Sequence, residues 1–315
     1  RLLADPRVQY VEEDGYVSAN PAYQHPASWG LDRVDQRNLP LDTWYTFFFL
    51  GNGVHAYVID TGIRATHQEF NWWTGAPPSR VSTGFTSVAD GNGTNDCNGH
   101  GTHVAATLGG GFAGVARGVT LHPVRVLNCA GSGTFAGVIA GMDWVAANRV
   151  LPAVANMSLG GGANASLDAA VANLTNAGVT VVVAAGNNAA DACNFSPARA
   201  PSAITVASSD SNDAQSWYSN YGSCVDLYAP GNGITSAWNT SDTATNTISG
   251  TSMASPHVAG LAALIAWRYP GATPAEVTAR VLSNSTPNKI TGAGPGTPNR
   301  LLYVLPNGGE YGTYP

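Results

Sequence analysis

Three short segments of this chain carry an acid, a base and a nucleophile. Val-Ile-Asp-Thr-Gly contains Asp60, Gly-His-Gly-Thr-His contains His100, and Gly-Thr-Ser-Met-Ala contains Ser252. A serine hydroxyl is a poor nucleophile at neutral pH unless a histidine takes its proton and a carboxylate holds that histidine in the right tautomer. The order Asp, His, Ser also differs from the other common orders, His–Asp–Ser and Ser–Asp–His. These residues therefore predict a serine peptidase.

Each segment alone has another interpretation. Asp-Thr-Gly is a common turn, serine favours helix N-caps, and His100 with His103 could bind a metal from one helical turn. A zinc peptidase would need a third ligand and a His-Glu-x-x-His segment, which the sequence lacks. An α/β-hydrolase esterase would need Gly-x-Ser-x-Gly followed by its histidine, whereas the base proposed here lies upstream. A catalytically silent binding module is a further alternative, although every residue of the triad is present.

Composition limits the class of protein and its partners. The chain has 315 residues, of which 44% are hydrophobic and 11% charged, which suits one large α/β domain with a substantial core. The net charge of −6 gives no electrostatic reason to expect nucleic acid as a partner. No apolar run reaches the 18 residues that a membrane-spanning helix requires. We expect a monomer that binds neither nucleic acid nor a membrane.

The four cysteines are Cys97, Cys129, Cys193 and Cys224, and none has the spacing of a metal-binding pair. An even number suits an oxidising compartment, where three pairings are possible. Four unpaired, buried thiols in a cytosolic protein are the alternative.

The apolar pattern alternates short strands with longer helices. Strand-like runs lie at 54–60, 119–126, 153–158, 179–184, 204–207 and 225–229, and helix-like stretches at 100–109, 135–150, 167–177, 251–269 and 273–283. This alternation predicts an α/β fold with three layers, a doubly wound and mostly parallel sheet with helices on both faces. Sites in such sheets gather beyond the carboxyl ends of the strands, where Asp60 and Asn187 both fall.

The first 28 residues differ from the rest of the chain. Residues 8–14 resemble a strand with charged ends, and residues 18–28 are rich in proline and alanine, as exposed linkers are. Charge appears at once at the N-terminus, without the pattern of a signal peptide. We therefore expect the chain to begin inside a longer precursor.

Taken with Ser-Leu-Gly-Gly at 158–161 and Ala-Ala-Gly-Asn at 184–187, the three segments match the signatures of the subtilisin-like serine peptidases. The chain most resembles the proteinase K branch, and within it the aqualysin-type enzymes, from about residue 29 to residue 303. The resemblance implies a secreted endopeptidase that works through an acyl-enzyme. It makes Ser252 the nucleophile, His100 the general acid and base, and Asp60 the carboxylate that orients His100. Asn187 matches the side chain that, with the N–H of Ser252, stabilises the oxyanion.

Two further segments resemble the strands that clasp an extended peptide in this family. Backbone hydrogen bonds would supply the affinity, and glycines would allow close approach. Phe135 matches the aromatic wall of the pocket three residues upstream of the primary one. The primary pocket carries no charge, so we expect broad specificity with an apolar or aromatic bias. The residues assigned to substrate are Gly131, Ser132, Gly133, Phe135, Ser158, Leu159, Gly160, Ala184 and Gly186.

The resemblance also implies calcium as a cofactor, because hard oxygen ligands within a few residues suit this ion. Asp226 aligns with a carboxylate of the family's strong calcium site, with the carbonyls of Pro201 and Ala203 as companions. A second group matches a calcium site of the proteinase K branch and consists of Asp32, Asp35, Gln36 and Asp42. Asp90 and Asp96 are a third candidate pair.

The N-terminus and the cysteines complete what the resemblance implies. Residues 8–14 resemble the last strand of the family's inhibitory propeptide, which makes residues 1–21 its remnant with a linker and 22–315 the peptidase domain. The chain's own propeptide would then be an inhibitor, beside protein and peptide substrates. The cysteines of the relatives at matching positions imply the pairs Cys97–Cys129 and Cys193–Cys224.

Overall fold

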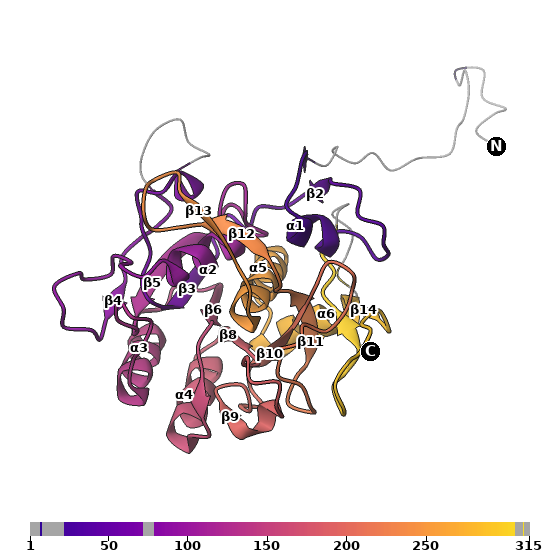
Figure 1. The fold of residues 1–315 in the computed structure, drawn as a ribbon. Helices are drawn as coiled ribbons and strands as arrows, with labels where there is room; N and C mark the ends of the chain where they lie inside the picture. The colour runs from indigo at the N-terminus through magenta and orange to yellow at the C-terminus, as the bar shows by residue number, and fades with distance from the viewer. Residues whose placement is uncertain (1–6, 8–21, 72–78, 306–310, 312–315) are drawn as a thin grey trace.

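The computed structural model describes Arg7, residues 22–71 and 79–305, and Tyr311 (Figure 1). The strand predicted at 8–14 lies outside the described residues, as does most of the segment assigned to a propeptide.

A nine-stranded sheet with the order β14-β15-β11-β10-β8-β6-β3-β5-β4 forms the centre of the molecule. Its strands run parallel except for β14, which pairs antiparallel with β15 at one edge. The six predicted strands form the continuous run from β11 to β5 in the middle of the sheet, because runs rich in valine and isoleucine suit strands covered on both faces. Their bounds are His55–Asp60 for β3, Thr120–Arg125 for β5, Ala153–Met157 for β6, Val179–Ala184 for β8, Ile204–Ser209 for β10 and Leu227–Pro230 for β11. The two edge strands are Phe85–Thr86 for β4 and Thr286–Pro287 for β14, and Arg300–Leu301 forms β15 between β14 and β11.

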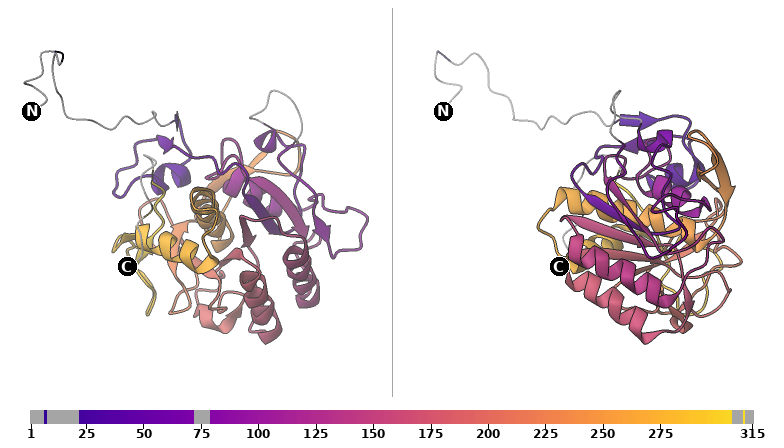
Figure 2. Two further views of the ribbon diagram at one scale, coloured as in Figure 1. Left: turned by 180° about the vertical axis from the view of Figure 1, so that it is seen from behind. Right: turned by 90° about the vertical axis from the view of Figure 1, so that its left-hand side faces the viewer.

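Helices cover both faces of this sheet. Helices α2 (His100–Gly109), α5 (Thr251–Arg268) and α6 (Pro274–Asn284) share one apolar core with Val58, Val154 and Val182 of the strands. Helices α3 (Phe135–Asn148) and α4 (Ala165–Asn176) pack on the opposite face, where they lie side by side in Figure 2. Successive strand residues point to opposite faces, which is why Val58 and Ile59 enter different cores. The predicted three-layer α/β fold is confirmed.

Several short elements were not predicted. They are β1 (Ala22–Gln24), α1 (Trp29–Val34), β2 (Tyr45–Phe47), η2 (Gln68–Phe70), β7 (Gly161–Gly162), η3 (Ala192–Asn194), β9 (Phe195–Ser196), and the antiparallel pair β12 (Ile234–Ala237) and β13 (Thr245–Ile248). None exceeds six residues, so none shows enough of a period to be recognised in the sequence.

Both disulfides implied by the family resemblance are formed, Cys97–Cys129 and Cys193–Cys224. The alternative of four free thiols is therefore wrong. No helix in the described part of the chain is long and apolar enough to cross a membrane.

Candidate active site

The three proposed catalytic residues stand where strands end or helices begin, at the carboxyl edge of the sheet. Asp60 is the last residue of β3, His100 is the first of α2, and Ser252 is the second of α5 (Figure 1). Asp60 is fully buried, and its Oδ1 accepts hydrogen bonds from Nδ1 of His100 and from the backbone N–H of Thr61, both at 2.7 Å. A carboxylate oxygen only accepts, so Nδ1 of His100 carries the hydrogen and Nε2 is left as the base.

Charges around His100 change its proton affinity. Burial of the imidazole lowers its pKa, but the charge and hydrogen bond of Asp60, together with the charge of Asp96, outweigh burial and raise the pKa above its ordinary value. The side chain is still 24% exposed, so a substrate can reach it. This environment stabilises the imidazolium that forms when His100 takes a proton.

Two glycines let α2 begin against β3. A Cβ on Gly101 would lie 2.2 Å from the carbonyl oxygen of Gly62, so a larger residue would push the helix away. Gly99 has φ +114°, and a Cβ there would lie 2.4 Å from the ring of Trp238. The glycines around His100 in the sequence are therefore required by the approach of three segments.

Asp96 stabilises the start of α2 through hydrogen bonds. Its carboxylate is buried and accepts hydrogen bonds from the hydroxyl of Thr61, the N–H groups of Asn98 and Gly99, and both the N–H and the hydroxyl of Thr102. Five bonds leave it little capacity to bind a metal. We conclude that Asp96 is a structural residue, which the sequence analysis missed.

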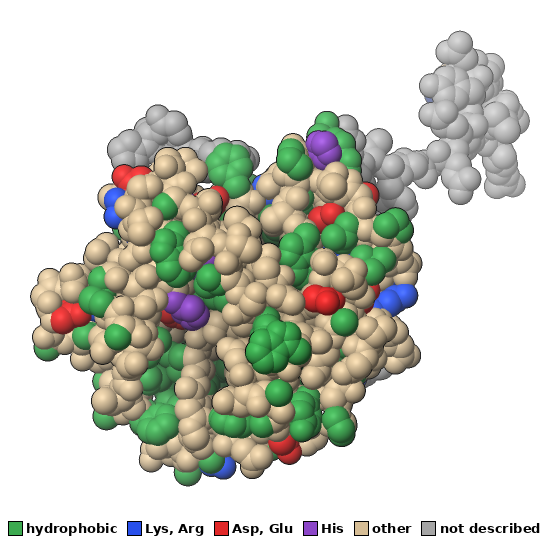
Figure 3. All heavy atoms as spheres, in the orientation of Figure 1, with side chains coloured by type: hydrophobic (Ala, Val, Ile, Leu, Met, Phe, Trp, Pro, Cys, Tyr) green, Lys and Arg blue, Asp and Glu red, His purple; other side chains and the backbone are tan. Residues whose placement is uncertain are grey.

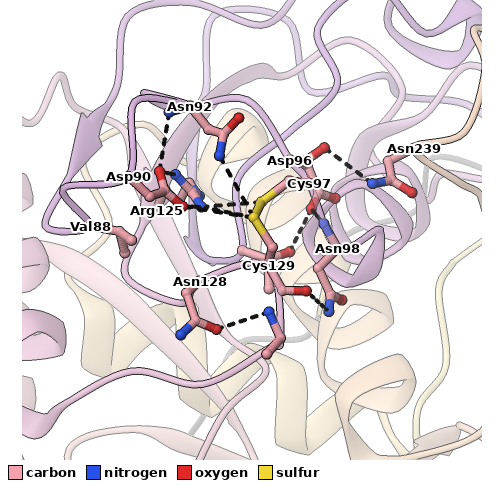
Figure 4. The surroundings of a disulfide bond; sticks show 12 residues. Val88, Asp90, Asn92, Asp96, Cys97, Asn98, Arg125, Asn128, Cys129 and Asn239 are labelled. Carbon is pink, nitrogen blue, oxygen red and sulfur yellow. Dashed lines mark hydrogen bonds and ion pairs between the residues drawn. A yellow bond between two sulfur atoms is a disulfide. The ribbon is translucent and has the colours of Figure 1, made fainter.

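Asp90, the other member of the third candidate pair, has a different partner. Both oxygens of Asp90 accept from the guanidinium of Arg125, at 2.6 and 2.5 Å, which lowers the pKa of the Asp90 carboxyl (Figure 4). The sulfurs near Asp90 belong to the Cys97–Cys129 disulfide and are not thiolate ligands. A cation would have to displace Arg125 from its carboxylate.

His103 also has a structural position. It is fully buried, and its Nε2 lies 3.0 Å from the carbonyl oxygen of Ile234. Because a carbonyl only accepts, Nε2 carries the hydrogen, and burial lowers the pKa of His103 to about 4. The imidazole therefore has no lone pair on that nitrogen for a metal shared with His100.

Ser252 is hydrogen-bonded to Ser158, the residue that follows β6. Its Oγ donates to the carbonyl oxygen of Ser158 at 3.2 Å, and the hydroxyl of Ser158 donates to the carbonyl oxygen of Ser252 at 2.8 Å. If Ser252 gives its proton to His100, as the sequence predicts, its hydroxyl hydrogen has to turn away from Ser158. Catalytic hydrogen bonds commonly tighten only when substrate is bound.

The amide of Asn187 is fixed by the residue before the serine. Its Oδ1 accepts from the backbone N–H of Thr251 at 2.8 Å and from the hydroxyl of Thr251 at 2.9 Å. The N–H can only donate, so the amide atom that it meets must be the oxygen, which leaves Nδ2 free to donate elsewhere. Nδ2 lies 3.5 Å from the Cβ position of Gly250, beside the N-terminus of α5. Thr251 is a site residue that the sequence analysis missed, although it stands within the serine segment.

Two cavities adjoin these residues and contain the predicted substrate residues. The first, of about 670 Å³, lies between the segments at 131–135 and 158–161, with His100 at its wall. The second, of about 420 Å³, contains Ser252 and Asn187 in its lining, together with Leu159, Gly160, and Ala184 to Gly186. Among the described residues that line either cavity there is no Asp, Glu, Lys or Arg.

The predicted calcium ligands form two separate groups. Pro201, Ala203 and Asp226 line one hollow of about 540 Å³, where they stand just before the starts of β10 and β11. Oδ2 of Asp226 accepts from the N–H of Thr205 at 2.8 Å, and burial raises the pKa of the carboxyl. Arg300, which also lines the hollow, opposes this shift.

The second group lies between α1 and β2. Burial raises the pKa of Asp35 to about 7, and the charges of Asp32 and Asp42 add to this rise. The pKa of Asp32 is also raised by burial, although N–H groups of Thr43 and Asp42 donate to it. The amide nitrogen of Gln36 donates to two carbonyls of the same loop, those of Asn38 and Pro40. Neighbouring carboxylates that disfavour the charge of Asp32 and Asp35 match the donor set of a calcium ion.

A comparison with protein families identifies the group to which this chain belongs. Residues 51–301 match the family model described as "Subtilase family". The chain belongs to the subtilase family. As a subtilase it is a hydrolase of the serine endopeptidase class, and the family resemblance predicted from the sequence is confirmed.

Curated relatives and a solved structure agree with this subtilase assignment. The chain is 60% identical to the "Extracellular serine proteinase" of Thermus sp. (strain Rt41A), over 96% of this chain and 72% of the relative. It is 52% identical to "Alkaline serine exoprotease A" of Vibrio alginolyticus, over 96% of this chain and 56% of the relative, so it spans little more than half of that protein. The crystal structure of a cold adapted subtilisin-like serine proteinase matches with a TM-score of 0.84 and 54% identity, over 89% of this chain and 99% of that one.

Proposed function

We propose that this subtilase is a secreted endopeptidase that cleaves peptide bonds through an acyl-enzyme on Ser252. The bond between Asp60 and Nδ1 of His100 supports this proposal most directly, because it leaves Nε2 as a base at the edge of the cavity. The name of the Thermus relative includes "Extracellular", and the two disulfides suit an oxidising compartment.

The proposed reaction has two halves. Oγ of Ser252 attacks the scissile carbonyl carbon while its proton passes to Nε2 of His100. The oxyanion of the tetrahedral intermediate accepts from Nδ2 of Asn187 and from the N–H of Ser252 at the start of α5. The C–N bond then breaks, and His100 gives its proton to the leaving amine. Water attacks the ester with His100 as the base and releases the acid and free Ser252.

The cavities suggest how a peptide binds. An extended chain between the segments at 131–133 and 158–160 would add a strand to each, with affinity from the backbone. The uncharged cavity beside Ser252 would take an apolar or aromatic side chain. On the face in Figure 3 the charged side chains are few and scattered, without a basic patch that would attract nucleic acid.

Replacing the nucleophile tests the proposal. Ser252→Ala should abolish hydrolysis of casein and of a peptide p-nitroanilide while the thermal melting curve stays that of the wild type. A fluorophosphonate should label the wild type and not the variant. A catalytically silent binding module would show neither hydrolysis nor labelling in the wild type. That result would refute the proposed peptidase activity.

We also propose that calcium binds at the two groups of residues described above as predicted calcium ligands. Asp226 would bind it with the carbonyls of Pro201 and Ala203, and Asp32, Asp35, Gln36 and Asp42 would form the other site. Their buried carboxylates lack a full complement of positive charge, which a calcium ion would supply. Bound calcium would join loops to the ends of the core and stabilise the folded chain.

The division into residues 1–21 and 22–315 is a proposal about maturation. If the first part is the end of an inhibitory propeptide, the enzyme should cleave itself between residues 17 and 22, and we expect a mature start near residue 22. N-terminal sequencing of the wild type and of Ser252→Ala, expressed without other proteases, measures this. Equal loss of the segment from both proteins would rule out self-cleavage.

A further inference from the structure

The turn at residues 128–133 forms one wall of the groove, but it has no apolar packing to hold it. Residues 128 to 133 are all exposed. Within the turn, Oδ1 of Asn128 accepts from the N–H groups of Ala130 and Ser132, and the N–H of Asn128 donates to the carbonyl of Ser132. These bonds fix the shape of the turn. Its place relative to His100 must come from contacts to other segments.

Those contacts converge on Arg125 and the Cys97–Cys129 disulfide (Figure 4). The Arg125 side chain is fully buried, and one of its NH groups lies 3.2 Å from the sulfur of Cys97 and 3.8 Å from that of Cys129. The other donates to the carbonyl of Gly93 at 3.2 Å, and both bind the carboxylate of Asp90. One buried guanidinium therefore contacts three segments that are exposed on their outer sides.

Asn98 connects this cluster with the catalytic base. Its Nδ2 donates to the carbonyl of Cys129 at 3.0 Å, and its Oδ1 accepts from the backbone N–H of His100 at 3.2 Å. Asn98 also lines the larger cavity. A shift of the disulfide would thus move both the groove wall and Asn98, which binds the first N–H of α2.

We propose that Arg125, with Asp90 as its counter-ion, is a positioning residue for substrate binding, which sets the groove wall at 131–133 relative to His100. Arg125 does not touch the substrate and acts through the disulfide and Asn98. A planar guanidinium suits this role because it donates in several fixed directions at once, whereas an ammonium cannot match that geometry. The inference rests on the proposed function, because it assumes that an extended peptide lies along this wall.

The test compares a tetrapeptide p-nitroanilide with a single acyl-amino-acid p-nitroanilide that has the same residue before the scissile bond. The measured quantity is the ratio of kcat/KM for the long substrate to that for the short one, which does not depend on the fraction of active enzyme. Arg125→Met and Asp90→Asn should each lower this ratio by about tenfold. This is the effect of losing roughly one hydrogen bond between the displaced groove wall and the longer substrate. Arg125→Lys keeps the charge and should recover part of the ratio. Thiol titration shows whether the disulfide remains closed.

Arg80→Met is the matched control. The guanidinium of Arg80 is half-buried and also donates to backbone carbonyls, those of Gly109, Val119 and Glu69, but it lies at the other end of α2. It should lower the melting temperature without changing the ratio. A wild-type ratio in Arg125→Met or Asp90→Asn, or an equal fall in Arg80→Met, would overturn the positioning role. A wild type that cleaves neither anilide would instead refute the proposed function, whereas one that cleaves both equally well would refute only the binding of an extended peptide along this wall.

Discussion

The orientation of Asn187 gives the sharpest test of the proposed oxyanion site. Two bonds from Thr251 hold its Oδ1, one from the backbone N–H at 2.8 Å and one from the hydroxyl at 2.9 Å. Thr251→Val keeps the shape of the side chain and removes only the second bond to Asn187. It also removes the acceptor for the N–H of Gly186, at 3.1 Å. Thr251→Ser keeps every one of these bonds and is the matched control.

The expected effects form a graded series. Loss of one of the two bonds that hold the amide is worth about 0.5–1.5 kcal/mol, so Thr251→Val should lower kcat by about two- to thirteenfold. The unpaired N–H of Gly186 should lower the free energy of unfolding by about 1 kcal/mol or more. Asn187→Ala removes the donor itself and should lower kcat by about 10²–10³ with little change in KM, a range that is carried over from subtilisin, a member of the same family.

Kinetics with a tetrapeptide p-nitroanilide measure this series, with active enzyme counted by fluorophosphonate titration and stability followed by thermal melting in calcium. Thr251→Ser should match the wild type within about twofold in kcat, since all of its bonds remain. A near-normal kcat in Asn187→Ala would remove Asn187 from the oxyanion site. A near-normal kcat in Thr251→Val, with Asn187→Ala impaired, would show that the hydroxyl does not orient the amide.

Three further predictions follow from the pKa of the base, the calcium ligands and the second disulfide. Catalysis needs neutral His100, and the pKa of His100 is raised, so kcat/KM should fall as the pH drops through that raised value. Asp60→Asn should move this acid limb of the profile to lower pH. An unmoved limb would contradict Asp60 as the cause of the raised pKa. Chelation by EDTA should lower the melting temperature and speed autolysis, and Asp226→Asn should show a smaller EDTA effect than the wild type; equal sensitivity would mean that Asp226 is not a ligand that matters. Replacing Cys193 and Cys224 by serine opens a loop with a sequence separation of 31. In the chain-entropy model this should reduce the free energy of unfolding by about 3–4 kcal/mol. An unchanged chemical unfolding curve would argue against that model for this disulfide.

The local pattern of apolar residues was enough to predict the central strands and the long helices of this protein. The six central strands and five long helices could be read from the sequence because each is a sustained apolar run or period that packs in the same way wherever it lies. The catalytic segments could be read for a similar reason. Asp60, His100 and Ser252 each stand at the end of a strand or the start of a helix, where glycines mark the close approach of neighbouring chains.

Residues that support the site from a distance could not be read in this way. Asp96 resembles any loop carboxylate in the sequence, yet in the structure it is saturated by Thr61, Asn98, Gly99 and Thr102. The sequence offered Asp90 and Asp96 as a pair of metal ligands because the spacing of acids does not reveal which partners surround them.

The amino-acid sequence by itself determined the fold class, the family and the chemical types at the reacting centre, because these depend on periodicity and on which side chains are present. Only the tertiary structure decided which nitrogen of His100 is the base and which way the amide of Asn187 faces. It also decided that Arg125 binds Asp90 beside the disulfide. Each of these is a hydrogen bond between residues at least 35 positions apart, whose donor and acceptor meet only when the strands and helices pack.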